Sequence, residues 1–234
     1  MSLLLNWCDR KAARYACEHW HYSKKLPVFK LNCIGVWEDE KYKGALVFSL
    51  GAAGACNGAK YGMKRNFEIA ELARVALNKP LAPVSKIVSV AIKMIARHNP
   101  GLKMLISFAD TREGHVGTIY QASNWVYAGT YDSSCDTYVV RGKEVHAKTL
   151  YSRYGRGGQS IPWLREHIDP TAQRIKSPPK HRYLYPLCSG ARKVIESFRK
   201  PYPKRAGGVT SSTPADQAGG GGANPTSALS SEVA

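Results

Sequence analysis

The sequence predicts an α/β fold built on a mixed central sheet with flanking helices. Between residues 67 and 129, apolar runs of strand length alternate with stretches of helical periodicity. The connections between these runs are short, so consecutive strands separated by a helix should be parallel and joined by a right-handed crossover. Polar residues gather where the first two of these strands end, and that edge is where open α/β sheets bind ligands.

The central elements are predicted in the order strand, helix, strand, helix, strand. Their expected bounds are Glu68–Leu77, Val84–His98, Lys103–Asp110, Val116–Ser123 and Trp125–Gly129. The long helix should stop at Asn99-Pro100-Gly101, because proline and glycine end helices.

A helix and a hairpin are expected before this core. Asp9 is placed to cap a helix running to about His19. Val28–Trp37 and Tyr42–Ser49 have strand composition and are joined by an acidic turn, which predicts a hairpin that opens the sheet. Gly51–Gly62 is rich in glycine and alanine, and we expect a mobile loop there.

The chain after the core is predicted to contain a second hairpin, two helices and a last strand. The hairpin strands are Thr137–Arg141 and Lys143–Lys148, and Ser160 caps a short helix. Arg182–Leu187 is the last strand and Gly190–Lys200 a basic helix. We therefore divide the chain into an α/β domain (1–148), a basic C-terminal extension (149–205) and a disordered tail rich in Gly, Ala and Ser (206–234).

The charge distribution indicates a polyanionic partner. All 34 Lys and Arg residues lie at or before Arg205, whereas two of the 17 acids, Asp216 and Glu232, lie after it. The first 205 residues therefore carry 34 − 15 = +19. Such an excess is typical of nucleic-acid binding, although a basic but inert surface is the alternative.

The cysteines and the N-terminus exclude two classes of protein. The six cysteines show neither a C-x-x-C pair nor the spacing of a zinc knuckle, so ordinary buried thiols in a reducing compartment are expected. No long apolar run predicts a signal peptide or a membrane span. We expect a cytoplasmic protein.

Several short segments carry a resemblance to a known family. They are Trp20-His21-Tyr22-Ser23, residues 71–78 (ELARVALN), Ser107-Phe108-Ala109-Asp110, residues 119–125 (IYQASNW) and Lys180-His181-Arg182-Tyr183. As a set in this order, between Trp7 and Leu187, they resemble the phage Mom family of DNA-modifying proteins. The order of predicted elements also resembles the GNAT (N-acetyltransferase) fold.

This resemblance implies a transferase that converts adenine in phage DNA to N6-carbamoylmethyladenine and so protects the DNA from host restriction enzymes. Double-stranded DNA is then the expected partner, and the target adenine must leave the base stack to reach the site.

The GNAT resemblance also implies a cofactor loop, and this chain departs from it. GNAT proteins hold the cofactor pyrophosphate on a loop of the form Q/R-x-x-G-x-G/A, whose glycines let backbone N–H groups approach phosphate. Arg74 is in register, but Leu77 and Lys79 replace the glycines. Acetyl-CoA is therefore disfavoured, while Arg74, Asn78 and Ser85 remain the candidate cofactor-binding residues.

The chemistry of the product points to another donor. Acetyl transfer to the adenine amine would lack the nitrogen of a carbamoylmethyl group, whereas a glycyl group on N6 is an isomer of it. We therefore expect an activated glycine, such as glycyl-tRNA, and tRNA becomes a second candidate partner.

The resemblance assigns catalytic roles to four residues. Asp110, Tyr120, His21 and Tyr22 are expected to converge on the target amine, either as acid/base groups or, for His21, Tyr22 and Asp110, as ligands of iron. Structural alternatives stay open for Asp110 as a helix cap and for Tyr120 as a core aromatic. Arg74 has the alternative of an ion pair with Glu68 or Glu71.

Basic residues near these segments are the candidates for contact with DNA phosphates. They are Lys24, Lys25, Lys60, Lys64, Arg65, Arg153, Arg156, Lys180 and Arg182. Two other functions remain open. One is a GNAT-type acyltransferase acting on RNA, protein or a small amine, and the other is a non-catalytic DNA-binding anti-restriction protein.

Overall fold

The computed structural model describes residues 2–28, 30–49, 57–63, 66–132 and 136–204. The chain divides into two compact units, each described by itself below. The first contains residues 1–49 and 72–95, and the second contains residues 50–71 and 96–210.

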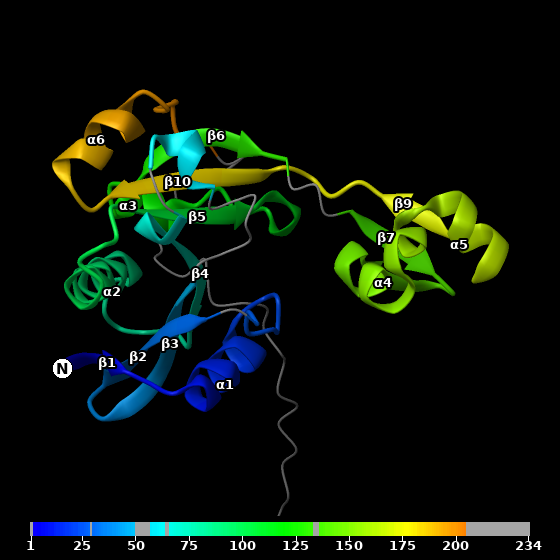
Figure 1. Ribbon diagram of the computed structural model, residues 1–234. Coiled ribbons are helices and arrows are strands. Elements are labelled where there is room, and N and C mark those ends of the chain that lie inside the picture. Colours follow the sequence, from blue (N-terminus) through cyan, green and yellow to red (C-terminus); the bar gives the residue numbers. More distant parts are fainter. Residues whose placement is uncertain (1, 29, 50–56, 64–65, 133–135, 205–234) are drawn as a thin grey trace, which may run out of the picture. The chain divides into compact units, whose positions relative to one another are not determined.

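A mixed sheet of seven strands has the order β1-β2-β3-β4-β5-β10-β6 (Figure 1). Its strands are β1 (Leu3–Trp7), β2 (Leu31–Glu38), β3 (Lys41–Ser49), β4 (Ile69–Leu77), β5 (Met104–Asp110), β6 (Val126–Tyr131) and β10 (Lys180–Pro186). β4 and β5 are parallel, while β1 and β3 pair antiparallel with β2, and β5 and β6 pair antiparallel with β10. The predicted α/β class with a mixed sheet and flanking helices is confirmed.

The first unit follows the predicted pattern closely. α1 (Arg10–Trp20) begins where Asp9 accepts a hydrogen bond from the backbone N–H of Ala12 at 2.7 Å, as the capping prediction required. Its buried face packs with β2 and β3 in one apolar cluster. α2 (Val84–His98) has the predicted bounds, and its last residues belong to the second unit.

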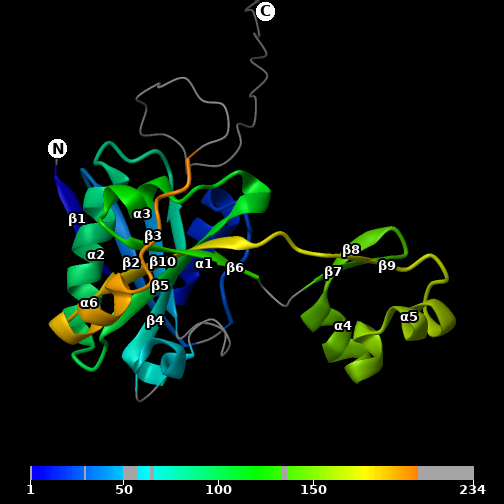
Figure 2. The same cartoon turned by 90° about the horizontal axis from the view of Figure 1, so that it is seen from above.

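The second unit holds a strand arrangement that differs from the prediction. β10 lies between β5 and β6, so these two strands are not neighbours (Figures 1 and 2). β10 belongs to residues 149–205, which were predicted to be a C-terminal extension. The extension therefore supplies an interior strand of the sheet. α3 (Thr118–Ala122) precedes β6, and α6 (Ser189–Glu196) contacts β10. α6 is thus shorter than the predicted helix.

The rest of the second unit forms a group of elements with its own core. Its strands and helices are β7 (Thr137–Val140), β8 (Lys143–His146), β9 (Gln173–Ile175), α4 (Ala147–Tyr154) and α5 (Ile161–His167). The sheet order is β8-β7-β9, and apolar side chains including Tyr138, Leu150 and Leu164 pack under it. The β7–β8 hairpin was predicted, but β8 ends at His146, whose side chain caps α4.

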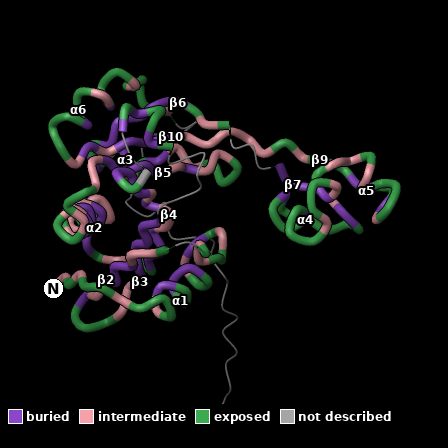
Figure 3. Tube along the Cα trace, in the orientation of Figure 1, coloured by how far each residue is buried: buried purple, intermediate pink, exposed green. Residues whose placement is uncertain are grey.

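Figure 3 shows that the buried residues are concentrated in the central strands and on one side of α2. β1 was not predicted from Leu3-Leu4-Leu5. The predicted loop at Gly51–Gly62 lies largely outside the described residues, although Gly58–Tyr61 forms a 3-10 helix. The tail 206–234 also lies outside them. No helix in the described part of the chain is both long and apolar enough to cross a bilayer.

Candidate active site

Asp110 lies at the carboxyl end of β5 and both of its carboxylate oxygens have partners. Oδ1 accepts a hydrogen bond from the backbone N–H of Arg112 at 3.1 Å, which caps the 3-10 helix Thr111–Glu113. Oδ2 lies 2.8 Å from the ammonium of Lys180, which stands directly opposite Asp110 in the antiparallel register of β5 and β10. The structural alternative, a helix cap, is therefore realised together with an ion pair that the sequence did not reveal.

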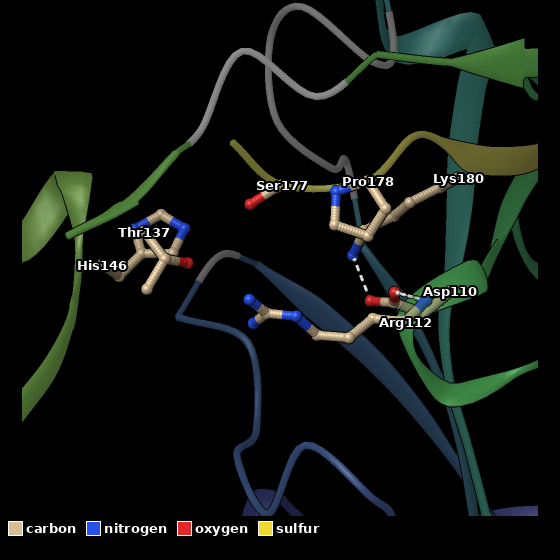
Figure 4. A pocket seen from close by; sticks show the side chains of 7 residues that line it. All are labelled: Asp110, Arg112, Thr137, His146, Ser177, Pro178 and Lys180. Atoms are coloured by element: carbon tan, nitrogen blue, oxygen red, sulfur yellow. Dashed lines mark hydrogen bonds and ion pairs between the residues drawn. The ribbon is translucent and has the colours of Figure 1, made fainter. Parts of the chain in front are cut away.

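A polar pocket opens beside this ion pair (Figure 4). Its volume is about 260 Å³, and its polar lining residues are Asp110, Arg112, Thr137, His146, Ser177 and Lys180. Arg112 is close to Asp110 in the sequence, whereas the other four, Thr137, His146, Ser177 and Lys180, are remote from it. A carboxylate beside two cationic side chains can bind an anion or hold a polar group through hydrogen bonds.

Tyr120 lies in α3 inside a buried aromatic group. Its ring centroid is 5.2 Å from that of Trp125 and 5.1 Å from that of Tyr183. Its hydroxyl accepts a hydrogen bond of 2.7 Å from Ser107, whose side chain is fully buried. The core-aromatic alternative matches these contacts, because the hydroxyl is satisfied within the protein.

His21 and Tyr22 follow the end of α1 in the first unit. Nδ1 of His21 lies 3.1 Å from the backbone nitrogen and 2.8 Å from the hydroxyl oxygen of Ser23, and its role as acceptor or donor depends on the tautomer of the ring. In the tautomer in which Nδ1 accepts the Ser23 N–H, Nε2 carries the proton and presents a hydrogen-bond donor. The Tyr22 ring packs on His21 with centroids 4.3 Å apart and is partly exposed.

This geometry bears on the predicted iron ligands. A metal-bound histidine normally donates its other ring N–H to a neighbour, and the Ser23 hydroxyl, 2.8 Å from Nδ1 of His21, is a neighbour of that kind. Ligation through Nε2 is compatible with the tautomer in which Nδ1 donates to this hydroxyl. Among the described residues, no three His, Cys, Asp or Glu side chains form a group suited to a metal ion. His21 and Asp110 also belong to different units, so their convergence remains a prediction.

Of the four described thiols, two are buried as expected, one is partly buried, and Cys188 is exposed. Cys17 and Cys33 are buried and free, and burial raises the pKa of the Cys17 thiol to about 11. Cys8 is partly buried, and the same cause raises its pKa to about 12. Protonated thiols are poor metal ligands and poor nucleophiles. Cys56 and Cys135 lie outside the described residues.

Arg74 supports the segment that follows His21. Its Nε donates to the backbone carbonyl of Lys25 at 3.2 Å, and one terminal nitrogen donates to the carbonyl of Ala73 at 2.6 Å. Glu68, one of the two partners considered for Arg74, pairs with Lys103 at 2.6 Å. Arg74 thus holds the backbone after α1 in place.

The connection from β4 to α2 is occupied by a carboxylate of the protein itself. The buried Glu38 at the end of β2 accepts hydrogen bonds from the backbone N–H groups of Leu81 and Ala82, at 2.9 and 2.7 Å. Asn78 is exposed and donates its backbone N–H to Lys43, while Ser85 lies in the first turn of α2. Glu38 therefore engages two backbone N–H groups of this connection from within the protein.

Similarity to known proteins identifies the family of this chain. The model of the Mom protein family matches residues 2–204. The chain belongs to the Mom protein family. It is 29% identical over 198 residues to the protein named methylcarbamoylase mom of Escherichia phage Mu, covering 82% of this chain and 80% of that protein. The fold is also similar to an aminoglycoside acetyltransferase, AAC(6')-Ib, solved with coenzyme A and kanamycin. That likeness has a TM-score of 0.42 and 10% identity, and covers 65% of this chain and 99% of the other.

The predicted phosphate contacts of this Mom family member differ in their surroundings. Five of them have exposed side chains: Lys24, Lys25, Lys60, Arg153 and Arg156. Lys180 is partly buried in its ion pair with Asp110. Lys64 and Arg65 lie outside the described residues.

Arg182 requires a correction. Its side chain is buried, donates to the carbonyl of Ala128 at 2.8 Å and lies over the ring of Tyr61. A guanidinium in this position is directed into the core and stabilises the pairing with β6, so it does not contact phosphate in this conformation. The basic character of the Lys180–Tyr183 segment predicted an exposed arginine, but the segment became an interior strand.

Sequence reasoning missed Glu38, Arg112 and the partnership of Lys180 with Asp110. Glu38 was assigned only to an acidic turn, and nothing in its neighbours along the chain points to Leu81. Arg112 follows Asp110 by two residues, which is the one sequence signal that could have indicated it. The Lys180 pairing depends on the register of β10, and register is decided by the whole sheet.

Proposed function

We propose that this chain is a transferase that modifies adenine in phage DNA, converting it to N6-carbamoylmethyladenine. The observation that carries the proposal is membership of the Mom family along nearly the whole chain, with a relative named methylcarbamoylase in phage Mu. The net charge of +19 on residues 1–205 suits a DNA substrate. The polar pocket beside Asp110 offers a place for the reacting nucleotide.

We infer that the donor is an activated glycine rather than acetyl-CoA. In the first step, the adenine N6 attacks the glycyl carbonyl, an N–C bond forms, and the carrier oxygen leaves with the proton lost from N6. The glycyl amine then attacks C6 of adenine, and the bond from C6 to the original N6 breaks. That nitrogen becomes the carboxamide, so the product is carbamoylmethyladenine with no atom gained or lost in the second step.

Glu38 supports this choice of donor. A buried carboxylate that accepts the N–H groups of Leu81 and Ala82 places negative charge where a CoA pyrophosphate would need positive potential. A glycyl ester of RNA needs no pyrophosphate site. We therefore favour glycyl-tRNA as the carrier, with Arg74 and Ser85 shaping the site in which the donor binds.

In the proposed reaction, His21 donates its Nε2 proton in a hydrogen bond to the oxygen of the carbonyl under attack. Tyr22 lies beside it as a partly exposed aromatic surface. Asp110, held by Lys180, orients the adenine amine, and Tyr120 fixes α3 through Ser107. These roles require His21 and Asp110 to meet at one substrate.

The test is nucleoside mass spectrometry of plasmid DNA from bacteria that express the chain. We expect an adenine species heavier by one glycyl unit, which becomes labelled when isotope-labelled glycine is supplied. Asp110→Asn should abolish it. Glu113→Gln, a change of the same kind on the adjacent exposed 3-10 helix, should leave it intact.

A non-catalytic DNA-binding function is favoured by one observation, the complete engagement of Asp110 in a cap and an ion pair. In that case, well-expressed protein would leave DNA unmodified and Asp110→Asn would not alter protection from restriction. Charge reversal at Arg153 and Arg156 would abolish protection instead.

A further inference from the structure

The pocket beside Asp110 carries more positive than negative charge. Its lining includes the guanidinium of Arg112 and the ammonium of Lys180, against one carboxylate. That carboxylate is already neutralised, because Asp110 lies 2.8 Å from Lys180 and accepts the N–H of Arg112. The charge left over in the pocket is that of Arg112.

Among the described residues, the partner of Arg112 for this charge is a weak one. Its guanidinium lies 3.8 Å from the carboxylate of Glu144 on β8, and the two side chains are 42% and 62% exposed. An ion pair of this length between solvated side chains contributes little to stability. An oxyanion with one or two negative charges would be a better partner if it presents two oxygens. The guanidinium can then donate two parallel N–H hydrogen bonds to it.

Further donors face the same space from the other side of the pocket. Figure 4 shows the Arg112 side chain reaching toward Thr137 and His146. Nδ1 of His146 accepts the backbone N–H of Lys148 at 3.1 Å, so a neutral ring carries its proton on Nε2. The hydroxyls of Thr137 and Ser177 add two groups that hydrogen-bond to oxygen.

We propose that this pocket binds a phosphate of the DNA backbone, with Arg112 as the residue that holds it. The proposal rests on the proposed function, and it deepens that function by placing a phosphodiester next to Asp110. Glu144 competes with the phosphate for Arg112. A backbone phosphate fixed here would position the nucleotide whose adenine approaches Asp110, without reading the base sequence.

The experiment is a salt titration of binding to a fluorescent DNA duplex, followed by anisotropy, with the full-length protein. Arg112→Gln should weaken binding roughly tenfold, as expected for a lost charged hydrogen bond. It should also reduce the slope of log K against log salt by about 0.9, the value for one phosphate contact. Both effects should be equal on duplexes of different sequence, and melting temperature should stay that of the wild type.

Two variants complete the design. Glu144→Gln removes the competing carboxylate and should tighten binding, which a loss of folding cannot imitate. Arg97→Gln, on the exposed side of α2, removes the same charge elsewhere and should leave the slope within error of the wild type. If Arg112→Gln binds DNA with the same affinity and the same salt slope as Arg97→Gln, the proposal is wrong.

Inorganic phosphate distinguishes the source of the ligand. If phosphate alone stabilises the wild type but not Arg112→Gln, and the DNA slope is unchanged, the pocket serves a small phosphate and the DNA assignment fails. The adenine modification is measured separately by nucleoside mass spectrometry. If Arg112→Gln does not change the salt slope while the wild type still modifies adenine, this inference is wrong and the proposed function stands.

Discussion

At the scale of single residues, the chemistry of the His21 ring depends on its contacts with Ser23. Nδ1 lies within hydrogen-bond distance of both the backbone nitrogen and the hydroxyl of Ser23, and whether it accepts or donates depends on the tautomer. The tautomer in which Nδ1 accepts presents an N–H group at Nε2, which is the form used in the proposed reaction. The ion pair with Lys180 likewise engages one carboxylate oxygen of Asp110.

Two substitutions at His21 distinguish the roles of its two ring nitrogens. Asparagine can reproduce the acceptor at Nδ1, and glutamine can reach the position of Nε2. We expect His21→Asn to keep the melting temperature within a few degrees of the wild type and to lose most adenine modification. His21→Gln should retain more activity than His21→Asn. The reverse order of activity, measured by nucleoside mass spectrometry, would show that the acceptor edge is the functional one.

At the scale of elements, the connection between β4 and α2 is stabilised by a buried acid from a neighbouring strand. Glu38 is almost fully buried, accepts two backbone N–H groups and lies 3.9 Å from Lys43. Lys79 in the same connection has a positive φ of 39°, a conformation that favours glycine. The connection thus keeps a tight turn without the glycines of the GNAT pattern.

Replacement of Glu38 should destabilise the first unit. Glu38→Ala removes the acceptor for Leu81 and Ala82 and leaves a buried N–H unsatisfied, which costs about 1–3 kcal/mol. Urea unfolding measures this change. Glu40→Ala, in the adjacent exposed turn, is the matched control and should change the free energy of unfolding by less than about 0.5 kcal/mol. Equal effects of the two would argue against the capping role.

At the scale of the whole molecule, the charge is confined to one part of the chain. Residues 206–234 contain two acids and no Lys or Arg, whereas the rest carries +19. Long-range attraction to DNA therefore depends on residues 1–205.

Removal of residues 206–234 should leave DNA binding intact. We expect the dissociation constant to stay within about twofold and the salt slope to be unchanged, because no phosphate contact is lost. The titration used for Arg112→Gln measures both quantities. A marked drop in affinity on truncation would assign the tail a direct part in binding.

Local pattern was enough to predict several elements and one cap. The apolar spacing of Val84–His98 gave α2 with its observed bounds, and Asp9 capped α1 as expected. These features depend on residues close together in sequence, where helical periodicity and side-chain capping act. β1 escaped prediction because an edge strand of five residues has too short an alternation to distinguish it from a coil.

The partners of the candidate site residues could not be predicted in the same way. Lys180 meets Asp110 across 70 positions of sequence, and Glu38 meets Ala82 across 44. Arg182 was expected at the surface and is buried, since β10 inserts between two strands. Each of these outcomes depends on strand order and register, which are set by the packing of the complete sheet.

The sequence by itself determined the α/β class, the resemblance to the Mom family, the basic character of residues 1–205 and the placement of Asp110 at the end of a strand. These follow from composition, local periodicity and short motifs, which are properties of neighbouring residues. Only the tertiary structure decided that Lys180 neutralises Asp110, that Glu38 fills the connection before α2, and that Arg112 faces a polar pocket. Those facts are contacts between distant segments, and such contacts exist only once the sheet has brought its strands together.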